Sequence, residues 1–193
     1  MGRNSRFNNE QFENAALKIA VDQGPAAVTI AAVAGAVGAP VGSVYHRFLS
    51  RDVILAKVWL RVVASFQKGF LEALGRGEGL QAALHTSRWV RLHPAEARIL
   101  LLYRREELVS GNWPEELRES AVQIRRQLDD GIRTYTKQTF GRCSREALDR
   151  TIFALIDVPY AAVRRHIQQA KKPHKAVEGY IKETYFAIMG RTI

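Results

Sequence analysis

Side chains that can bind an anion follow directly after an alanine- and glycine-rich stretch, in "AAVAGAVGAPVGSVYHRFLSRD", residues 31–52. Ser43, Tyr45 and His46 fall within about one helical turn, and Arg51 comes five residues after His46. Hydroxyl, imidazole and guanidinium groups donate hydrogen bonds, and phosphate oxygens and base edges accept them. The spacing therefore favours a surface that contacts a nucleic acid.

The element before this stretch has clear start and stop signals. Asn8 and Gln11 fit a capping box ahead of a helix over residues 9–23. Gly24 followed by Pro25 ends that helix. A first helix of this length can support the shorter helices that follow it.

Two short helices are expected next. Thr29 predicts the N-cap of one that ends at Gly38, and Pro40 suits the first position of another. Short helices joined by about four residues around a glycine are typical of a helix-turn-helix, whose second helix enters the major groove. On that helix the predicted contacts are Val41, Ser43 and His46 near the groove, Gly42 where the backbone comes close, and Tyr45 at a phosphate.

The stretch resembles the DNA-binding domain of the tetracycline-repressor (TetR) family of bacterial transcription regulators, whose usual pattern ends in "S-K-G-T-L-Y-x-x-F-x-S-K". The resemblance covers about residues 8–56 and is carried by Thr29, Gly38, Gly42, Ser43, Val44, Tyr45, Phe48, Ser50 and Arg51. It implies that Thr29, Tyr45 and Arg51 hold phosphates, that Ser43 and His46 contact backbone or bases, and that Arg3 and Arg6 form a basic arm.

Two residues depart from the family pattern. Pro40 stands where a capping serine is usual, and Val41 where a lysine is usual. One cap bond and one cationic contact are then missing from each recognition helix. We therefore expect modest DNA affinity, carried partly by Val41 packing on a thymine methyl group.

The rest of the chain is expected to be helical throughout, which makes the fold class all-α. Start and stop signals predict helices over 51–74, 79–92, 95–109, 115–139, 145–170 and 174–189. Pro159 falls inside one of them and should bend or split it near Asp157. The predicted domains are a helix-turn-helix DNA-binding domain, 1–52, and a helical effector-binding and dimerisation domain, 53–193.

By resemblance, the second domain holds a small-molecule site and a dimer interface. The effector residues predicted there are aromatic: Trp59, Phe66, Trp89, Tyr103, Phe153 and Tyr160. One hypothesis is that an anionic effector is bound by one of the arginines Arg88, Arg91, Arg98, Arg104 and Arg105. The pattern "RREE" at 104–107 instead favours ordinary solvated helix faces. The last two long helices would form a homodimer through residues 145–189.

The distribution of charge bears on which kinds of partner the protein can bind. The net charge of +10 favours anionic partners, but residues 1–52 hold five basic and four acidic side chains, whereas residues 53–193 hold 24 and 15. The basic excess thus lies away from the motif, and the DNA prediction depends on geometry.

Cys143 is the only cysteine, and His85 and His93 are eight residues apart. This spacing fits no known metal or catalytic signature, so we expect no metal, no cofactor and no enzyme. No apolar run approaches about 18 residues, which predicts no membrane span and a cytoplasmic protein.

The sequence predicts a TetR-type regulator that binds a palindromic duplex operator as a dimer, acting as a repressor released by a small-molecule effector. The alternative is a helical ligand-binding or scaffold protein without sequence-specific DNA binding. The low charge of residues 1–52 and the departure at Val41 keep this alternative open.

Overall fold

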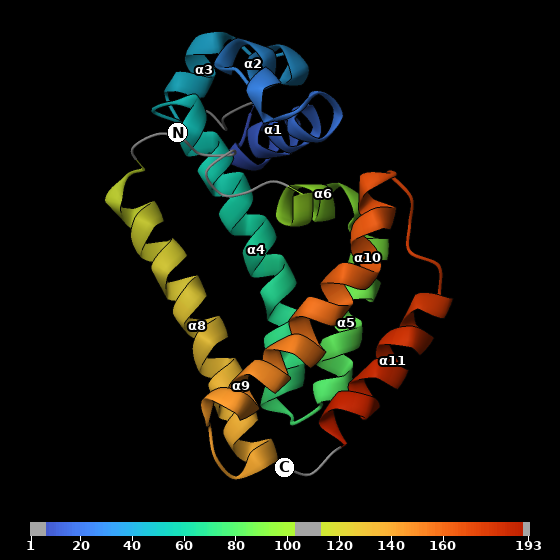
Figure 1. The fold of residues 1–193 in the computed structure, drawn as a ribbon. Helices are drawn as coiled ribbons and strands as arrows, with labels where there is room; N and C mark the ends of the chain where they lie inside the picture. The colour runs from blue at the N-terminus through green and yellow to red at the C-terminus, as the bar shows by residue number, and fades with distance from the viewer. Residues whose placement is uncertain (1–6, 103–112, 191–193) are drawn as a thin grey trace.

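The fold is built from helices, and the computed structural model describes residues 7–102 and 113–190; no strand occurs in those ranges (Figure 1). The helices are α1 (Asn9–Gln23), α2 (Ile30–Val37), α3 (Val41–Tyr45), α4 (Arg51–Gly75), α5 (Gly79–Leu92), α6 (Pro94–Leu102), α8 (Glu115–Phe140), α9 (Arg145–Ile152), α10 (Val158–Gln168) and α11 (Ala176–Met189). A 3-10 turn, η1 (Pro25–Ala27), and a π turn, η2 (Phe153–Asp157), complete the set. No helix in the described ranges is long and apolar enough to cross a membrane.

The start of α1 confirms the predicted capping box. The Asn8 carboxamide oxygen accepts from the Gln11 amide at 2.9 Å, and the Gln11 side chain accepts from the Asn8 amide at 2.9 Å. Phe7 packs against Phe12, with ring centroids 6.2 Å apart, as a hydrophobic staple. Phe12 also meets Phe48 edge-on at 6.2 Å, and both are fully buried. The start of α1 is thereby fastened to the end of the helix-turn-helix.

The turn between α2 and α3 depends on a left-handed glycine. Gly38 has φ of 69°, and the next amide, that of Ala39, bonds back to the Ala34 carbonyl at 2.9 Å. Pro40 lies at the N-cap of α3, one residue before its predicted position, and α3 ends at Tyr45. After Tyr45 the chain forms a turn in which the amides of Arg47 and Phe48 both bond to the Val44 carbonyl at 2.9 Å.

A single helix, α4, runs from this N-terminal cluster into the rest of the molecule (Figure 1). Ser50 caps it by accepting from the Val53 amide at 3.3 Å. Its 25 residues span roughly 37 Å. It packs against α1 and α6, and also against α5 and α8. This one element connects the N-terminal helices to the C-terminal ones.

The C-terminal helices surround the far end of α4, with α8 on one side and α5, α10 and α11 on the other (Figure 1). The interruption expected near Asp157 is present: the Val158 amide bonds to the carbonyl of Phe153, five residues back, in η2. Pro159 has no amide to continue the regular pattern, and its ring crowds the carbonyl four residues earlier, which the wider turn relieves. The part of the predicted helix 95–109 beyond Leu102 lies outside the described residues.

An ion-pair cluster joins α5 to α11. Glu178 accepts from Arg88 Nε at 3.0 Å and from Arg91. Burial disfavours the charged carboxylate, but the hydrogen bonds from Arg91 and Arg88 outweigh it, so the pKa of Glu178 lies below its usual value.

A tyrosine pair joins α8 to α11 over the first residue of α5. Tyr135 Oη lies 3.0 Å from Tyr185 Oη. Burial, followed by the hydrogen bond to Tyr135, raises the pKa of Tyr185, so its hydroxyl stays protonated. A Cβ atom on Gly79 would overlap the Tyr135 hydroxyl and lie 2.7 Å from the Tyr185 hydroxyl. Only a glycine fits beneath this pair.

We expect Glu178 to make stability pH-dependent. A carboxyl whose folded pKa is lowered binds fewer protons than in the unfolded chain, so its contribution is present above the unfolded pKa and is lost as the pH falls through the folded value. In urea unfolding between about pH 6 and 3, Glu178→Gln should lose less stability on acidification than the wild type. Glu183→Gln, an exposed carboxylate on the same helix, is the control and should keep the wild-type profile.

Gly79→Ala should lower the free energy of unfolding by about 1–3 kcal/mol, because the new methyl group displaces the tyrosine pair. Gly35→Ala is the matched control: its Cβ would meet no atom within 4 Å, and better helix propensity should stabilise α2 by up to about 1 kcal/mol. Urea unfolding of both variants checks this, and equal effects would contradict the packing described here.

Candidate nucleic-acid interface

The predicted contact residues lie at the N-cap of α2, on α3 and directly after it, and at the start of α4 (Figure 1). Val41 is 45% exposed and Tyr45 58% exposed, whereas Val44 is fully buried. Gly42 and His46 are also exposed, and Ser43 is half-buried. The short helix α3 thus has one face in the core and another in solvent, as a recognition helix requires.

Two of the predicted residues already have local roles. Thr29 caps α2, its hydroxyl oxygen accepting from the Ala32 amide at 3.0 Å, which leaves the hydroxyl proton for a phosphate. Pro40 supplies no side-chain acceptor to α3. That result agrees with the missing cap bond expected from the sequence.

Arg51 holds the N-terminal helices together. Its Nε donates to the Val28 carbonyl and its Nη2 to the Pro25 carbonyl, both at 2.7 Å, while Nη1 lies 2.8 Å from an Asp52 oxygen. A guanidinium has five N–H groups, so a phosphate contact would use those that remain. The family resemblance implied only a phosphate role, because nothing in the sequence pattern connects residue 51 to the η1 turn.

Arg47 was not predicted as a functional residue. Like Arg51, it holds separate segments of the N-terminal helices together. It donates to the Ser43 carbonyl at 3.0 Å and to the Phe7 carbonyl at 2.8 Å. Its guanidinium also lies 5.8 Å from the centroid of the Phe12 ring. The bond to Phe7 spans forty residues of sequence, so no local pattern could have indicated it. The predicted arm residues Arg3 and Arg6 lie outside the described residues.

The predicted effector aromatics fall into separate groups. Phe66 meets Trp89 edge-on at 5.3 Å and His85 at 5.2 Å. Trp59 contacts Trp113 at 6.2 Å. Among the others, Phe153 is 51% exposed, Tyr160 donates to the Leu101 carbonyl at 2.9 Å, and Tyr103 lies outside the described residues.

The group around Phe66 has the chemistry of a small-molecule site. Burial lowers the pKa of His85, whose Nε2 lies 2.8 Å from the Phe66 carbonyl, so the neutral ring donates that bond. The indole nitrogen of Trp89 is buried and has no hydrogen-bond partner among the described residues. An apolar wall with one unsatisfied donor can orient a ligand. Elsewhere in the described part of the chain, no group of three or more metal-binding side chains comes together.

The helices expected to form a dimer carry exposed apolar side chains. On α11, Tyr180 is 65% exposed and Phe186 53% exposed. By contrast Ile181 and Leu155, which fall within the predicted interface range 145–189, are buried within one chain. The interface prediction therefore concerns the outer aromatic side chains and not those two residues.

Arg51→Ala should lower the free energy of unfolding by about 1–3 kcal/mol, because it removes donors from the part-buried Val28 and Pro25 carbonyls. Tyr45→Phe removes an exposed hydroxyl and should change the same quantity by less than about 0.5 kcal/mol. Urea unfolding distinguishes them. Equal stability of the two variants would mean that Arg51 does not act as a clamp.

Comparison with known proteins places these features in a family. Residues 14–58 match the family model described as "Bacterial regulatory proteins, tetR family". No curated protein matches the chain.

Solved structures extend the likeness to nearly the whole chain. A structure described as a tetR family transcription regulator from Shewanella sp. PV-4 has a TM-score of 0.70 at 19% identity, covering 95% of this chain and 96% of that one. The transcriptional regulator FadR from Bacillus subtilis, in complex with stearoyl-CoA, has a TM-score of 0.67 at 16% identity, covering 95% and 100%. A TetR family regulator from Marinobacter aquaeolei VT8 has a TM-score of 0.56 at 16% identity, covering 94% and 92%. Residues 14–58 therefore resemble the tetR family of bacterial regulatory proteins, and nearly the whole chain shares the fold of solved TetR-family transcription regulators.

Proposed function

We propose that this protein is a homodimeric, cytoplasmic transcription regulator that binds a palindromic duplex operator and, as a repressor, leaves it when a small-molecule effector binds. The observation that carries the proposal is the two-faced helix α3. Val44 anchors it in the core while Val41 and Tyr45 face solvent, within a segment that matches the family model. Residues 1–52 would read DNA, and residues 53–193 would bind the effector and dimerise.

Each exposed contact residue has a role that suits its chemistry. Val41 packs against a thymine methyl group, and Gly42 lets the backbone approach the groove. Ser43 and His46 donate to bases or backbone, and Tyr45 donates to a phosphate. Thr29 and Arg51 add phosphate contacts through the O–H and N–H groups that are not used in their bonds to the protein backbone. With few cations available, we expect the affinity to fall only shallowly with salt.

The effector site that we favour lies around Phe66 and Trp89. Phe66 belongs to α4, whose first residue, Arg51, clamps the helix-turn-helix module, so one helix contacts both sites. Ligand binding by the same fold in the FadR complex supports a site among the C-terminal helices. An effector that favours one position of α4 over another would change the separation of the two recognition helices in the dimer.

The dimer would form through α9, α10 and α11. Tyr180 and Phe186 on α11 and Phe153 in η2 are large apolar side chains exposed in the single chain. A two-fold contact brings the same patch of both subunits together and removes these rings from water.

One observation favours the second candidate, a helical ligand-binding or scaffold protein without sequence-specific DNA binding. The arginines nearest the reading surface, Arg47 and Arg51, donate to the chain's own carbonyl groups. Guanidinium groups that form hydrogen bonds within the module leave fewer cationic donors for phosphates.

Enrichment of a random duplex library by the purified protein tests the proposal. We expect a palindromic site with half-sites about one helical turn, or a multiple of it, apart. Tyr45→Phe should weaken binding to that site roughly tenfold, since it loses a hydrogen bond to a charged phosphate. Thr134→Val is the control, because it removes an exposed hydroxyl from α8, outside both α3 and the proposed dimer helices, and should bind DNA like the wild type.

Absence of enrichment at low salt would contradict the regulatory proposal and support the scaffold alternative. Arg51→Ala is not a suitable test of DNA contact, because the loss of its carbonyl bonds disturbs the whole reading module.

A further inference from the structure

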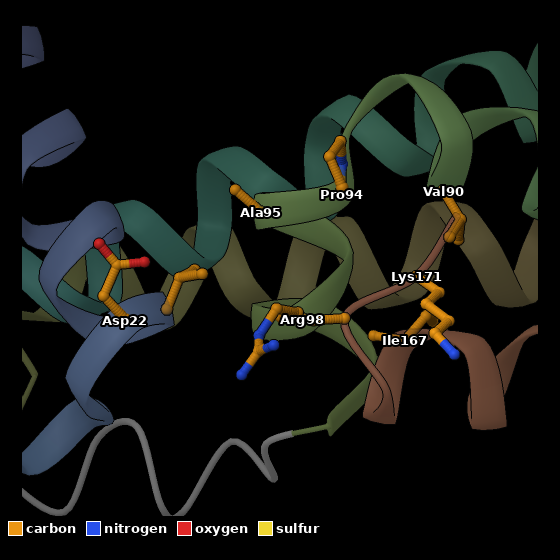
Figure 2. Close-up of a pocket in the computed structure, with 9 residues that line it drawn as sticks. Asp22, Val90, Pro94, Ala95, Arg98, Ile167 and Lys171 are labelled. Carbon is orange, nitrogen blue, oxygen red and sulfur yellow. The ribbon is translucent and has the colours of Figure 1, made fainter. Parts of the chain in front are cut away.

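A cavity of about 420 Å³ lies where α1, α5, α6 and the end of α10 meet (Figure 2). We call it the α1–α6–α10 cavity. Val90, Pro94 and Ile167 supply apolar walls, and Asp22, Arg98 and Lys171 are its charged residues. The volume lies within the range of small-molecule sites. Of the predicted effector aromatics that the structure describes, none lines it.

Neither Arg98 nor Lys171 has a side-chain partner among the residues that the structure describes. Arg98 forms no ion pair or hydrogen bond among the described residues, and its Nε is buried. Figure 2 shows its side chain extending from α6 on the side that faces α1, which carries Asp22. No ion pair is found between Asp22 and either Arg98 or Lys171, although all three line the same space. Counted over the described lining residues, two cations and one carboxylate give a net charge of +1.

The position of Lys171 is fixed by the way in which α10 ends. Ala170 has φ of 54°, a left-handed conformation that alanine adopts reluctantly, and it is the sole non-glycine residue with positive φ in the described chain. The Lys171 amide bonds to the His166 carbonyl at 2.8 Å and the Ala170 amide to the Ile167 carbonyl at 3.0 Å. This helix-ending turn brings Lys171 to the cavity (Figure 2).

The buried Nε–H of Arg98 is energetically unfavourable while it has no acceptor. The planar guanidinium group matches the geometry of a carboxylate, which would supply one. We propose that the α1–α6–α10 cavity binds a small carboxylate with an apolar body. Arg98 donates to the carboxylate, and Val90, Pro94 and Ile167 hold the apolar part. Lys171 adds positive charge from the other side of the cavity (Figure 2). Asp22 repels a second negative charge, which favours a monoanion.

Binding here would also affect the DNA-reading module. Val21 and Asp22 are in the last turn of α1, which belongs to that module, while the other walls come from the C-terminal helices. A ligand would therefore bridge the two parts of the chain and bias their relative position. This consequence, but not the binding itself, rests on the proposed regulatory function.

Calorimetric titration of the full-length protein with octanoate tests the site. We expect saturable binding, with octan-1-ol at least about tenfold weaker because it carries no charge. Arg98→Gln should weaken octanoate binding about tenfold or more and abolish the preference over octan-1-ol. Arg98→Lys should fall between them, and Lys171→Gln should cost about threefold. Arg133→Gln, an exposed arginine on α8, is the matched control and should bind like the wild type.

No saturable octanoate binding, equal binding of octanoate and octan-1-ol, or full binding by Arg98→Gln would overturn the site. A second arm measures DNA affinity with and without octanoate, using an enriched duplex. A change in the wild type that is missing in Arg98→Gln supports the regulatory consequence, and no change in the wild type overturns that consequence alone. If no duplex is enriched, the regulatory function fails while the titration still decides the cavity.

Discussion

The continuous helix α4 is the constraint on which the rest of the structure depends. Its first turn is fixed by the Ser50 cap and by the bonds from Arg51 to the Pro25 and Val28 carbonyls. Its far end is enclosed by α5 and α8 (Figure 1). Because the hydrogen bonds of a helix are internal, α4 transmits position over its whole length more faithfully than a loop would. The reading helix α3 and the C-terminal helices therefore cannot be placed independently of one another.

Several arginines of this protein hold its helices together and are therefore not free to bind a partner. Arg47 and Arg51 hold the N-terminal helices, and Arg88 and Arg91 hold α11 to α5 through Glu178. Arginine suits this task because its fork satisfies two carbonyl or carboxylate acceptors at once. Arg98, by contrast, lines a cavity and has no hydrogen-bond or ion-pair partner among the described residues. The contrast between engaged and unengaged arginines is what singles out the α1–α6–α10 cavity.

Much of the fold could be predicted, because helix boundaries depend on a few neighbouring residues. The Asn8–Gln11 capping box, the Thr29 and Ser50 caps and the Gly38 turn are local signals, and the structure confirms them. The interruption before Pro159 is equally local. The sequence placed His46 on α3, whereas the helix ends at Tyr45, because its end depends on how Arg47 and Phe48 turn back into the core.

The candidate sites were less predictable, because they are made by residues distant in sequence. The pattern identified the outward face of α3, but it could not show that Arg51 bonds to residues 25 and 28 or that Arg47 reaches Phe7. It grouped six aromatic residues that the structure distributes among separate contacts. The sequence by itself determined the helices, their caps and the two-faced recognition helix, since these follow from hydrogen bonding and hydrophobic spacing within a few turns. Only the tertiary structure decided which cations are engaged and where a cavity remains, because both depend on which helices the packing of the core brings together.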